Sequence, residues 1–143
     1  SHYLNRFYLS ASKERKGVDQ QVHDLRIKVS ATENLVTSLS GGNQQKVVVG
    51  KSLLTSPRVL MMDEPTRGID VAAKGEIFEI MNQLALKGLA VVFVSSELKE
   101  ILAMADRVLV MAKGRLTAEF SRAEMTQEAI VAASVQTIEK VSA

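Results

Sequence analysis

The sequence contains no cysteine and few aromatic residues, and each shortage excludes a class of site. Without cysteine, the 143-residue chain can form no disulfide, no thiolate metal site and no covalent intermediate on a thiol. Aromatic residues make up only 4% of the chain, which favours aliphatic helices packed on a sheet over an aromatic binding surface. The two histidines, His2 and His23, have no partner at ligand spacing and are expected to be ordinary surface residues.

Long apolar runs and a strong charge of either sign are also absent. The longest apolar runs have about six residues, whereas a helix that spans a bilayer needs about 20, and the N-terminus does not resemble a signal peptide. The 18 basic and 16 acidic side chains leave a net charge of +2, which gives nucleic-acid binding little support. With 46% hydrophobic residues, the composition predicts a globular domain with a core, able to dock on a membrane protein.

A phosphate-binding loop of the form GxxxxGK[ST] is missing as well. The nearest candidate is Gly50-Lys51-Ser52, but the motif requires a glycine five residues before Gly50, where Gln45 stands. The segment also lies inside a predicted helix instead of between a strand and a helix. We therefore reject it as a phosphate loop.

Two other motifs, both between Leu39 and Asp70, do point to nucleotide chemistry. The first, LSGGNQQKV, is a glycine pair that opens a helix, predicted over residues 42–56 with Ser40 as its N-cap and Pro57 as its stop. A hydroxyl and successive backbone N–H groups at a helix start suit a terminal phosphate. The two glycines let the backbone approach it closely.

The second motif, VLMMDEPTRGID, is an apolar strand over residues 59–62 that ends in Asp63 and Glu64. Ligands of open α/β sheets bind at the carboxyl ends of the strands. There an aspartate can coordinate Mg²⁺, and the next glutamate, which points the other way in extended chain, can orient or deprotonate an attacking water. An acidic pair alone would indicate a solvated turn, but the apolar run before it and RGID after it favour the magnesium site.

The rest of the chain alternates strands and helices in the order of an α/β domain with parallel strands. In the helix over 42–56, the predicted apolar face holds Val47, Val48, Leu53 and Leu54. Asp70 is expected to cap a helix that ends at Gly88 and buries a stripe of Ile77, Ile80, Met81 and Leu84. The later elements are a strand over 90–94, a helix from Ser95 or Ser96 to about residue 105, a strand over 107–111, a turn at Lys113-Gly114 into a hairpin partner over 115–120, and a helix over 122–134.

The first 38 residues are less regular. Tyr3, Leu4, Phe7 and Tyr8 have the spacing of a short amphipathic helix, and residues 24–29 alternate as in a strand or an extended arm. This N-terminal stretch, with the polar segment between them, is interpreted as a solvated part of a larger domain in preference to a binding patch.

These residues resemble ATP-binding-cassette (ABC) ATPases, strongly over residues 39–114 and more weakly on either side. In that family LSGGQ is the signature motif, an apolar strand that ends in DE is the Walker B motif, and the segment after it is the D-loop. Here they read Leu39–Asn43, Val59–Glu64 and Arg67–Asp70. The variants NQQKV, DEPTRGIDV and VSSEL are similar to the second cassette of bacterial importers of ribose, galactose and xylose.

The resemblance implies an α/β fold, a partial P-loop NTPase domain with parallel strands flanked by helices and without the phosphate-loop strand. Residues 1–38 would belong to the helical or arm region of the cassette. Residues 39–143 would carry the signature helix, the Walker B motif and the C-terminal α/β part.

The resemblance also implies that ATP and Mg²⁺ bind only in an intact dimer of cassettes, with Asp63 serving the metal and Glu64 acting as the general base. The intact protein would be an ATP hydrolase, and the fragment without a phosphate loop would show no specific ATP binding. Closure of the cassettes on ATP would move transmembrane permease subunits. A periplasmic sugar-binding protein would be an indirect partner. The chain would lie peripherally at the cytoplasmic face of the bacterial inner membrane and bind no nucleic acid.

In such a dimer the signature faces the nucleotide held by the opposite cassette. Ser40, Gly41 and Gly42 would touch its γ-phosphate, and Asp70 would couple the two sites. Asn43 stands where the signature usually has glutamine, and the sequence leaves open whether its shorter amide weakens the contact.

A second departure is Ser96, which occupies the position of the family's switch histidine after the strand over 90–94. A serine cannot replace an imidazole that positions the γ-phosphate and the attacking water. Hydrolysis with this chain's own Walker B residues is therefore in doubt, whereas its signature could serve the opposite site fully. The family also places the phosphate-loop strand beside the strand over 90–94, so an uncovered edge predicts that the fragment self-associates there.

Two other functions stay open at this point. A non-transport cassette ATPase in DNA repair or translation would use the same LSGG and DEP elements, but the basic or coiled-coil insertions usual in such proteins are not visible. A degenerate cassette that serves as a regulatory module is favoured by Ser96 and disfavoured by Asp63 and Glu64. The sugar cannot be identified from these motifs.

Overall fold

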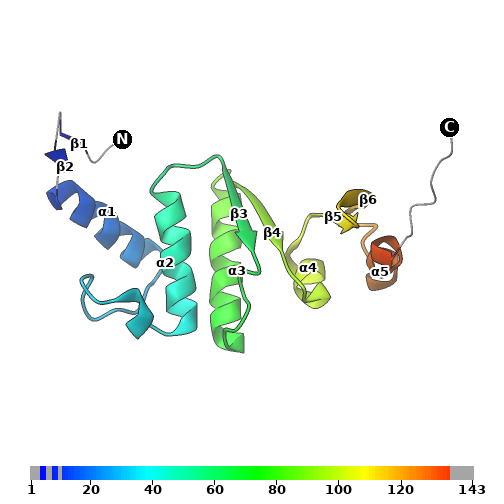
Figure 1. The fold of residues 1–143 in the computed structure, drawn as a ribbon, viewed down its shortest axis with the longest axis horizontal. Coiled ribbons are helices and arrows are strands. Elements are labelled where there is room, and N and C mark those ends of the chain that lie inside the picture. The colour runs from blue at the N-terminus through cyan, green and yellow to red at the C-terminus, as the bar shows by residue number, and fades with distance from the viewer. Residues whose placement is uncertain (1–3, 6–7, 10, 136–143) are drawn as a thin grey trace. The chain divides into compact units, whose positions relative to one another are not determined.

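The computed structural model describes residues 4–5, 8–9 and 11–135 and divides the chain into two units, each described by itself (Figure 1). The first unit, Ser1–Val94, contains β1 (Leu4–Asn5), β2 (Tyr8–Leu9), α1 (Ala11–Asp24), the 3-10 helix η1 (Val36–Ser38), α2 (Gly41–Leu53), β3 (Val59–Asp63), α3 (Val71–Leu86) and β4 (Ala90–Val94). The second unit, Ser95–Ala143, contains α4 (Leu98–Met104), β5 (Arg107–Ala112), β6 (Arg115–Ser121) and α5 (Gln127–Val135).

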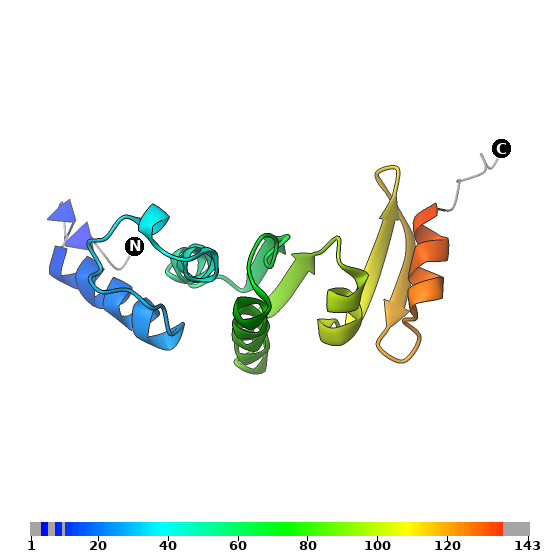
Figure 2. The ribbon, with the colours of Figure 1, turned by 90° about the horizontal axis from the view of Figure 1, so that it is seen from below.

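The strands β3 and β4 form a parallel pair, and α3 is the crossover between them (Figure 2). The pairing runs from Val59 opposite Ala90 to Asp63 opposite Val94, which confirms the predicted strand–helix–strand unit. One face of the pair is open among the described residues, since Met61 is 76% exposed while Leu60 is 4% exposed. No third strand joins this sheet in the described part of the chain, so the self-association expected at the edge of β4 stays a prediction.

The core of the first unit lies where α2, α3, β3 and the segment after α1 meet. Each aliphatic side chain buried here contributes about 1.5–3 kcal/mol relative to an exposed one. The buried residues of this cluster are Leu25, Ile27, Val49 and Leu60, and the α3 residues Ile80 and Leu84 pack against them. The core therefore joins segments that are distant in sequence.

The helix α3 has the predicted ends and the predicted apolar stripe. Asp70 is its N-cap, with Oδ1 accepting a hydrogen bond from the Ala73 N–H at 2.9 Å. Gly88 follows its C-terminus with a φ of +89°, a conformation that glycine adopts without a steric penalty. Ile77 and Met81 are buried at 0% and 3% exposure, as expected for this face.

The helix α2 buries only part of the predicted apolar face, since Val47 and Leu53 pack against the core. Its buried positions are Gly42, Lys46, Val49 and Gly50, whereas Val48, expected inside, is 55% exposed. The reason is the small size of the glycines: a Cβ added at Gly50 would lie 3.0 Å from Leu25 Cδ1, so this face admits a close neighbour. The buried face follows small residues more than apolar ones.

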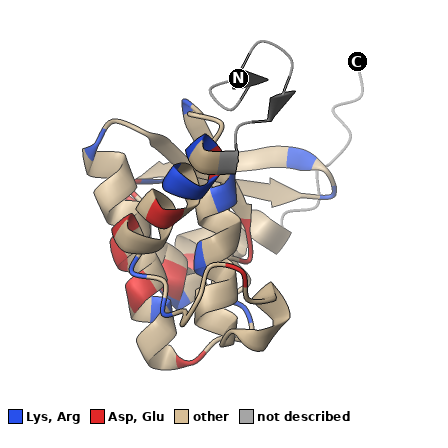
Figure 3. Cartoon of the chain, turned by 90° about the vertical axis from the view of Figure 1, so that its left-hand side faces the viewer, with Lys and Arg blue, Asp and Glu red and all other residues tan. Residues whose placement is uncertain are grey.

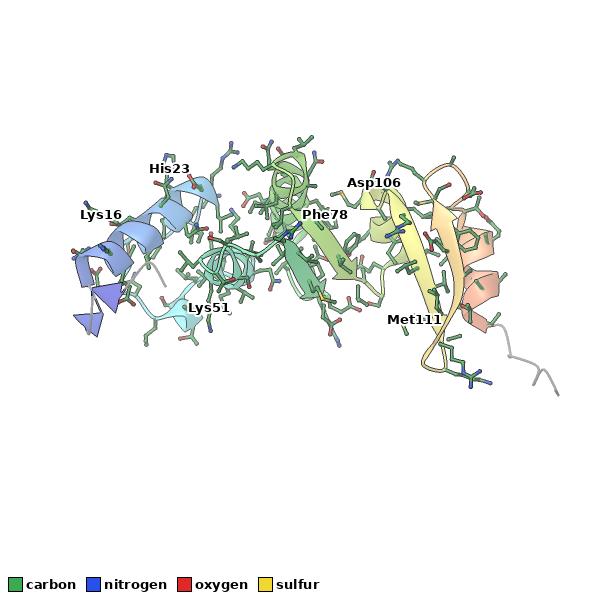
Figure 4. The ribbon with its side chains drawn as sticks, turned by 90° about the horizontal axis from the view of Figure 1, so that it is seen from above. Lys16, His23, Lys51, Phe78, Asp106 and Met111 are labelled. Atoms are coloured by element: carbon green, nitrogen blue, oxygen red, sulfur yellow. The ribbon has the colours of Figure 1, made fainter. Side chains whose placement is uncertain are left out.

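The segment Gly50-Lys51-Ser52 lies inside α2, which confirms that it is not a phosphate loop. Figure 4 shows Lys51 on this helix, where its side chain is exposed. The helix ends at Leu53. Ser56, the residue before Pro57, lies outside the helical region with a φ of +51°.

The predicted amphipathic helix near the N-terminus is wrong where the structure describes it. Leu4–Asn5 and Tyr8–Leu9 pair as short antiparallel strands, with Leu4 opposite Leu9. Tyr3, Phe7 and His2 lie outside the described residues. The helical spacing was too short a signal to outweigh the strand preference of these residues.

The polar stretch interpreted as a solvated segment is the helix α1, which the sequence analysis missed. Most of its described side chains are exposed, including His23, so the surface expectation for this histidine is confirmed (Figure 4). After α1 the chain forms no strand at residues 24–29 but runs on as an arm. Its alternation is real, since Leu25 and Ile27 are buried while Lys28 is exposed.

The second unit is a hairpin packed on a helix. β5 and β6 pair antiparallel, and the turn between them has Lys113 at φ +51° and Gly114 at φ +76°. Val108 and Val110 are buried on the face of β5 that α5 covers. The hairpin is confirmed, but β5 belongs to this separate sheet and does not extend the parallel pair.

The last two helices are shorter than predicted. α4 begins at Leu98 because Ser95 and its neighbours form the preceding turn, in which the Glu97 N–H donates to Ser95 Oγ at 3.0 Å. α5 begins at Gln127 because the residues after β6 make other bonds: Glu124 accepts from the Ser121 N–H at 3.1 Å, and Arg122 donates to the Ala105 carbonyl at 2.8 Å.

A buried lysine ties the helices of the first unit together. Lys46 is 2% exposed, and its Nζ lies 2.6 Å from Glu76 Oε2 on α3 and donates to the Arg26 carbonyl on the arm at 3.1 Å. The hydrogen bond and charge of Lys46, with a smaller effect of Lys28, hold the pKa of Glu76 below its usual range. Figure 3 shows acidic and basic residues interspersed on the helices, and sequence inspection gave no means to single out this pair.

We expect this ion pair to make stability depend on pH. Because the pKa of Glu76 is lowered in the folded chain, its contribution is present above the unfolded pKa, near pH 4.5, and is lost as the pH falls through the lower folded pKa. Glu76→Gln should therefore lower the free energy of unfolding by about 0.5–1 kcal/mol at pH 7, since the Glu76 carboxylate is half exposed and screened by water, and by less at pH 3, as measured by urea unfolding. Glu79→Gln, one turn away, is the control. An equal loss for Glu76→Gln at both pH values would contradict the pairing.

Candidate functional site

The glycine-headed end of α2 is built by backbone geometry and not by a side-chain cap. Ser40 is the N-cap residue, with φ −61° and ψ 154°, but its hydroxyl accepts no backbone N–H. The hydrogen-bond ladder starts with the Gln44 N–H, which donates to the Ser40 carbonyl at 2.9 Å. Since the N–H groups of a first helical turn have no acceptor inside the helix, this end of α2 can bind an anion.

Asn43 connects this end of the helix to the arm. Its Oδ1 accepts the backbone N–H of Lys28 at 2.9 Å, and its Nδ2 donates to Ser40 Oγ at 2.9 Å. Gln44 makes a second local bond, in which Nε2 donates to the Leu39 carbonyl at 2.8 Å. The side chains after the glycine pair are thus engaged within the chain.

The two glycines allow α2 to approach the segment that follows the acidic pair. A Cβ at Gly41 would lie 3.2 Å from Ile69 Cγ2, and a Cβ at Gly42 would lie 2.6 Å from the Cβ of Ala73. The second distance is shorter than any carbon–carbon contact tolerates, so Gly42 is required by packing. The structure therefore brings together the two motifs that the sequence analysis singled out.

Asp63 ends β3 opposite Val94, with an exposed side chain, so a carboxylate does stand at the carboxyl end of a parallel strand. Glu64 departs from expectation. Its φ is +48°, so the chain is not extended here, and the expectation that Glu64 simply points away from Asp63 as in a strand is wrong. The Glu64 N–H donates to the Val94 carbonyl at 2.9 Å and fixes this turn to the end of β4.

The turn after Glu64 is fixed by two buried residues and a hydrogen bond. Pro65 and Thr66 are buried, and the Arg67 N–H donates to the Glu64 carbonyl at 3.1 Å. Gly68 has a φ of +74°, a conformation that glycine adopts most readily. The buried Pro65 and Thr66 therefore fix the turn, and Asp63 before it keeps an exposed carboxylate.

Ser96 belongs to the second unit, between β4 and α4, and its role stays a prediction. Beside it lies a residue that the sequence analysis missed. Glu100 is 6% exposed and accepts a hydrogen bond from the Ser95 hydroxyl at 2.7 Å. Nothing in the sequence distinguishes this glutamate from a solvated residue in the first turn of a helix.

The donors present fit a shared site for Mg²⁺ better than a metal cage. Among residues 4–5, 8–9 and 11–135, no group of three or more histidine, cysteine, aspartate or glutamate residues could hold a metal ion. Mg²⁺ in nucleotide sites is bound by one or two carboxylates together with substrate phosphates and water, and Asp63 supplies one such carboxylate. In the part of the chain that the structure describes, no helix is long and apolar enough to cross a membrane.

Comparison with known proteins supports these motifs. The family model of the ABC transporter matches residues 3–67. The chain is 56% identical over 124 residues to the xylose import ATP-binding protein XylG of Moorella thermoacetica and 48% identical over 129 residues to the ribose import ATP-binding protein RbsA of Oceanobacillus iheyensis. These alignments cover 87% and 90% of this chain but 25% and 26% of the relatives, so the chain spans about a quarter of their length.

A solved structure shows the same fold. The dimeric ATP-binding cassette MJ0796, in a post-hydrolysis state bound to ADP and Pi, superposes with a TM-score of 0.70 at 22% identity. The match covers 82% of this chain and 51% of that one. The predicted α/β cassette fold, as a partial domain, is therefore confirmed.

The contact at Gly42 predicts a substitution that packing alone makes costly. Gly42→Ala should lower the free energy of unfolding of the chain by about 1–3 kcal/mol, because the added methyl overlaps Ala73. Ala73→Gly in the same chain should restore part of that loss. Gly75→Ala is the matched control: it lies within α3 with nothing within 4 Å of the added Cβ, so it should stabilise by about 0.5–1 kcal/mol. Equal effects of the two glycine substitutions in urea unfolding would rule out the close approach.

The backbone of Glu64 predicts that glycine is the better residue there for stability. Glu64→Gly should be more stable than Glu64→Ala by about 0.5–1 kcal/mol, because alanine keeps the cost of a positive φ and both variants lack the carboxylate. At Asp63, inside β3, the order of the glycine and alanine variants should reverse. If the alanine variant were the more stable one at both positions in thermal unfolding, Glu64 would not be strained.

Proposed function

Since this chain belongs to the ABC transporter family, we propose that it is part of an ATP-binding cassette, the C-terminal portion of the second cassette of a bacterial monosaccharide importer. The observation that carries this proposal is the packing of the glycine-headed end of α2 on the turn and helix that follow Asp63 and Glu64. Identity to xylose and ribose import ATP-binding proteins supports a monosaccharide of that kind as the cargo.

In the intact protein, ATP would be shared between two cassettes. The Ser40 hydroxyl and the first N–H groups of α2 would face the γ-phosphate of the nucleotide held by the opposite cassette. Bound Mg²⁺ would neutralise charge on the phosphates, and Asp63 would hold it through its exposed carboxylate. Glu64 would accept the proton of the attacking water, and Asp70, which caps α3 beside the glycine pair, would link the two sites.

Hydrolysis would drive a permease in the membrane. Closure of two cassettes on ATP is a domain movement of the kind that can be passed to transmembrane subunits, with the chain peripheral at the cytoplasmic face. A periplasmic sugar-binding protein would deliver the sugar. The alternatives of a non-transport cassette and a degenerate module gain no support from the relatives, whose names are those of import proteins.

The asymmetry caused by Ser96 gives the test. In the full-length protein with its permease, Gly41→Asp should lower ATP turnover by about 100-fold or more at the site this signature completes, because a carboxylate would meet the γ-phosphate. Glu64→Gln should cost less than about tenfold, because it acts at the site where Ser96 replaces the switch histidine. Turnover is measured as phosphate release together with uptake of labelled xylose or ribose into vesicles.

Gly41→Ala is the steric control for the first variant, since it adds only the Cβ that approaches Ile69 at 3.2 Å. It should lower turnover by clearly less than Gly41→Asp, because it adds a methyl group and no charge. Equal and complete losses for Gly41→Asp and Glu64→Gln would refute the asymmetric pair of sites. Turnover without uptake of either sugar would refute the proposed cargo.

A further inference from the structure

We propose that Asn43 is a positioning residue, which diverts the Ser40 hydroxyl from capping α2 and so keeps the whole first turn of that helix free to donate to a terminal phosphate. This inference rests on the proposed function, in which the signature faces the γ-phosphate. It gives the asparagine that replaces the usual glutamine a role inside the chain instead of a contact with the nucleotide.

The orientation of the Asn43 amide is fixed by its partner on the arm. The backbone N–H of Lys28 can only donate, so the amide atom that meets it at 2.9 Å must be the carbonyl oxygen Oδ1. The other end of the amide, the Nδ2 group, then faces Ser40 Oγ at 2.9 Å and must donate to it. The main chain of the arm therefore settles which way Asn43 points.

The same chain of bonds settles the role of Ser40. Its oxygen accepts from Asn43, so its own hydrogen is left to donate, and it has no acceptor among the described residues. An N-cap serine normally uses that oxygen to accept the N–H of the second or third helical residue. Because Ser40 makes no such bond, the N–H groups of Gly42 and Asn43 keep their capacity to donate to an anion.

The arm is held firmly enough to act as a support. Leu25 and Ile27 are buried on one side of it, and the Arg26 carbonyl accepts from the buried Lys46 at 3.1 Å. The Lys28 N–H and the Arg26 carbonyl thus bond to Asn43 and Lys46, which lie on neighbouring turns of α2. Through its two hydrogen bonds, Asn43 thus holds the Ser40 hydroxyl in a fixed position relative to the backbone of the arm.

A double-mutant cycle in the full-length protein, assembled with its permease, tests the proposal. Ser40→Ala and Asn43→Ala should each raise the KM for ATP about tenfold, as expected for the loss of a hydrogen bond to a charged group. The double variant should resemble Ser40→Ala within about twofold, because Asn43 acts through Ser40. Asn34→Ala is the matched control: its amide donates to the Ser30 hydroxyl at 2.9 Å in the loop before the signature, and it should leave KM unchanged.

Each other outcome overturns the inference in a recognisable way. A multiplicative loss of about a hundredfold in the double variant would mean that Asn43 contacts the nucleotide itself. No effect of Asn43→Ala beside a clear effect of Ser40→Ala would remove the positioning role and leave the proposed function intact. No effect of Ser40→Ala would refute the phosphate contact itself.

A second variant guards against loss of folding, which is checked by the thermal unfolding midpoint. Asn43→Asp keeps the acceptor for the Lys28 N–H and loses the donor to Ser40. Its added charge weakens ATP binding whether or not the Ser40 hydroxyl is present, so the comparison is made in the Ser40→Ala background. When Ser40→Ala is added to the Asn43→Asp variant, the further rise in KM should be only about twofold, because Asn43→Asp has already removed the donor to Ser40. A full tenfold extra loss would overturn the proposal.

Discussion

The close packing of α2 on the first turn of α3 is the constraint on which the rest of the site depends. Gly42 meets Ala73 where no larger residue fits, and one turn further along both helices Lys46 meets Glu76. A steric contact and an ion pair on the same interface fix both the separation of the two helices and their register. Because α2 carries the glycine-headed end and α3 continues the chain after the acidic pair, the two motifs share one rigid frame.

The positive φ of Glu64 follows from how the turn after β3 is held at both ends. A non-glycine residue at φ +48° is held at a cost of about 1–3 kcal/mol, and it persists because the surroundings leave the chain no other path. Pro65 and Thr66 are buried after it, and the Glu64 N–H is held by the Val94 carbonyl at the end of β4. A glycine would relieve the strain but would remove the side chain. Arg26, Ser56 and Lys113 also have a positive φ, so the strain by itself does not mark Glu64 as a site residue.

Local rules predicted the parts of this fold that local interactions determine. The strands β3 and β4, the Asp70 cap and the Gly88 terminus all follow from short sequence patterns, and the structure has each of them. Features set by distant partners were not accessible in this way. The buried face of α2 depends on what approaches its glycines, the burial of Lys46 depends on Glu76 thirty residues later in the chain, and the start of α5 is delayed by bonds that Arg122 makes with another segment. The site residues were therefore found by motif, and their supports only by structure.

The arm after α1 shows how a segment without a strand partner can still be ordered. Its side chains alternate between core and solvent as in a strand, but the N–H groups of its first three residues donate to carbonyls of α1. Two further main-chain groups pair with side chains of α2, since Asn43 accepts the Lys28 N–H and Lys46 donates to the Arg26 carbonyl. Each of these hydrogen bonds contributes about 0.5–1.5 kcal/mol, and together they link the arm to α2. The bond from the Lys28 N–H to Asn43 and the bond from Asn43 to Ser40 form one chain from the arm to the start of α2. The glycine-headed end of α2 is for this reason coupled to a segment that lies outside both motifs.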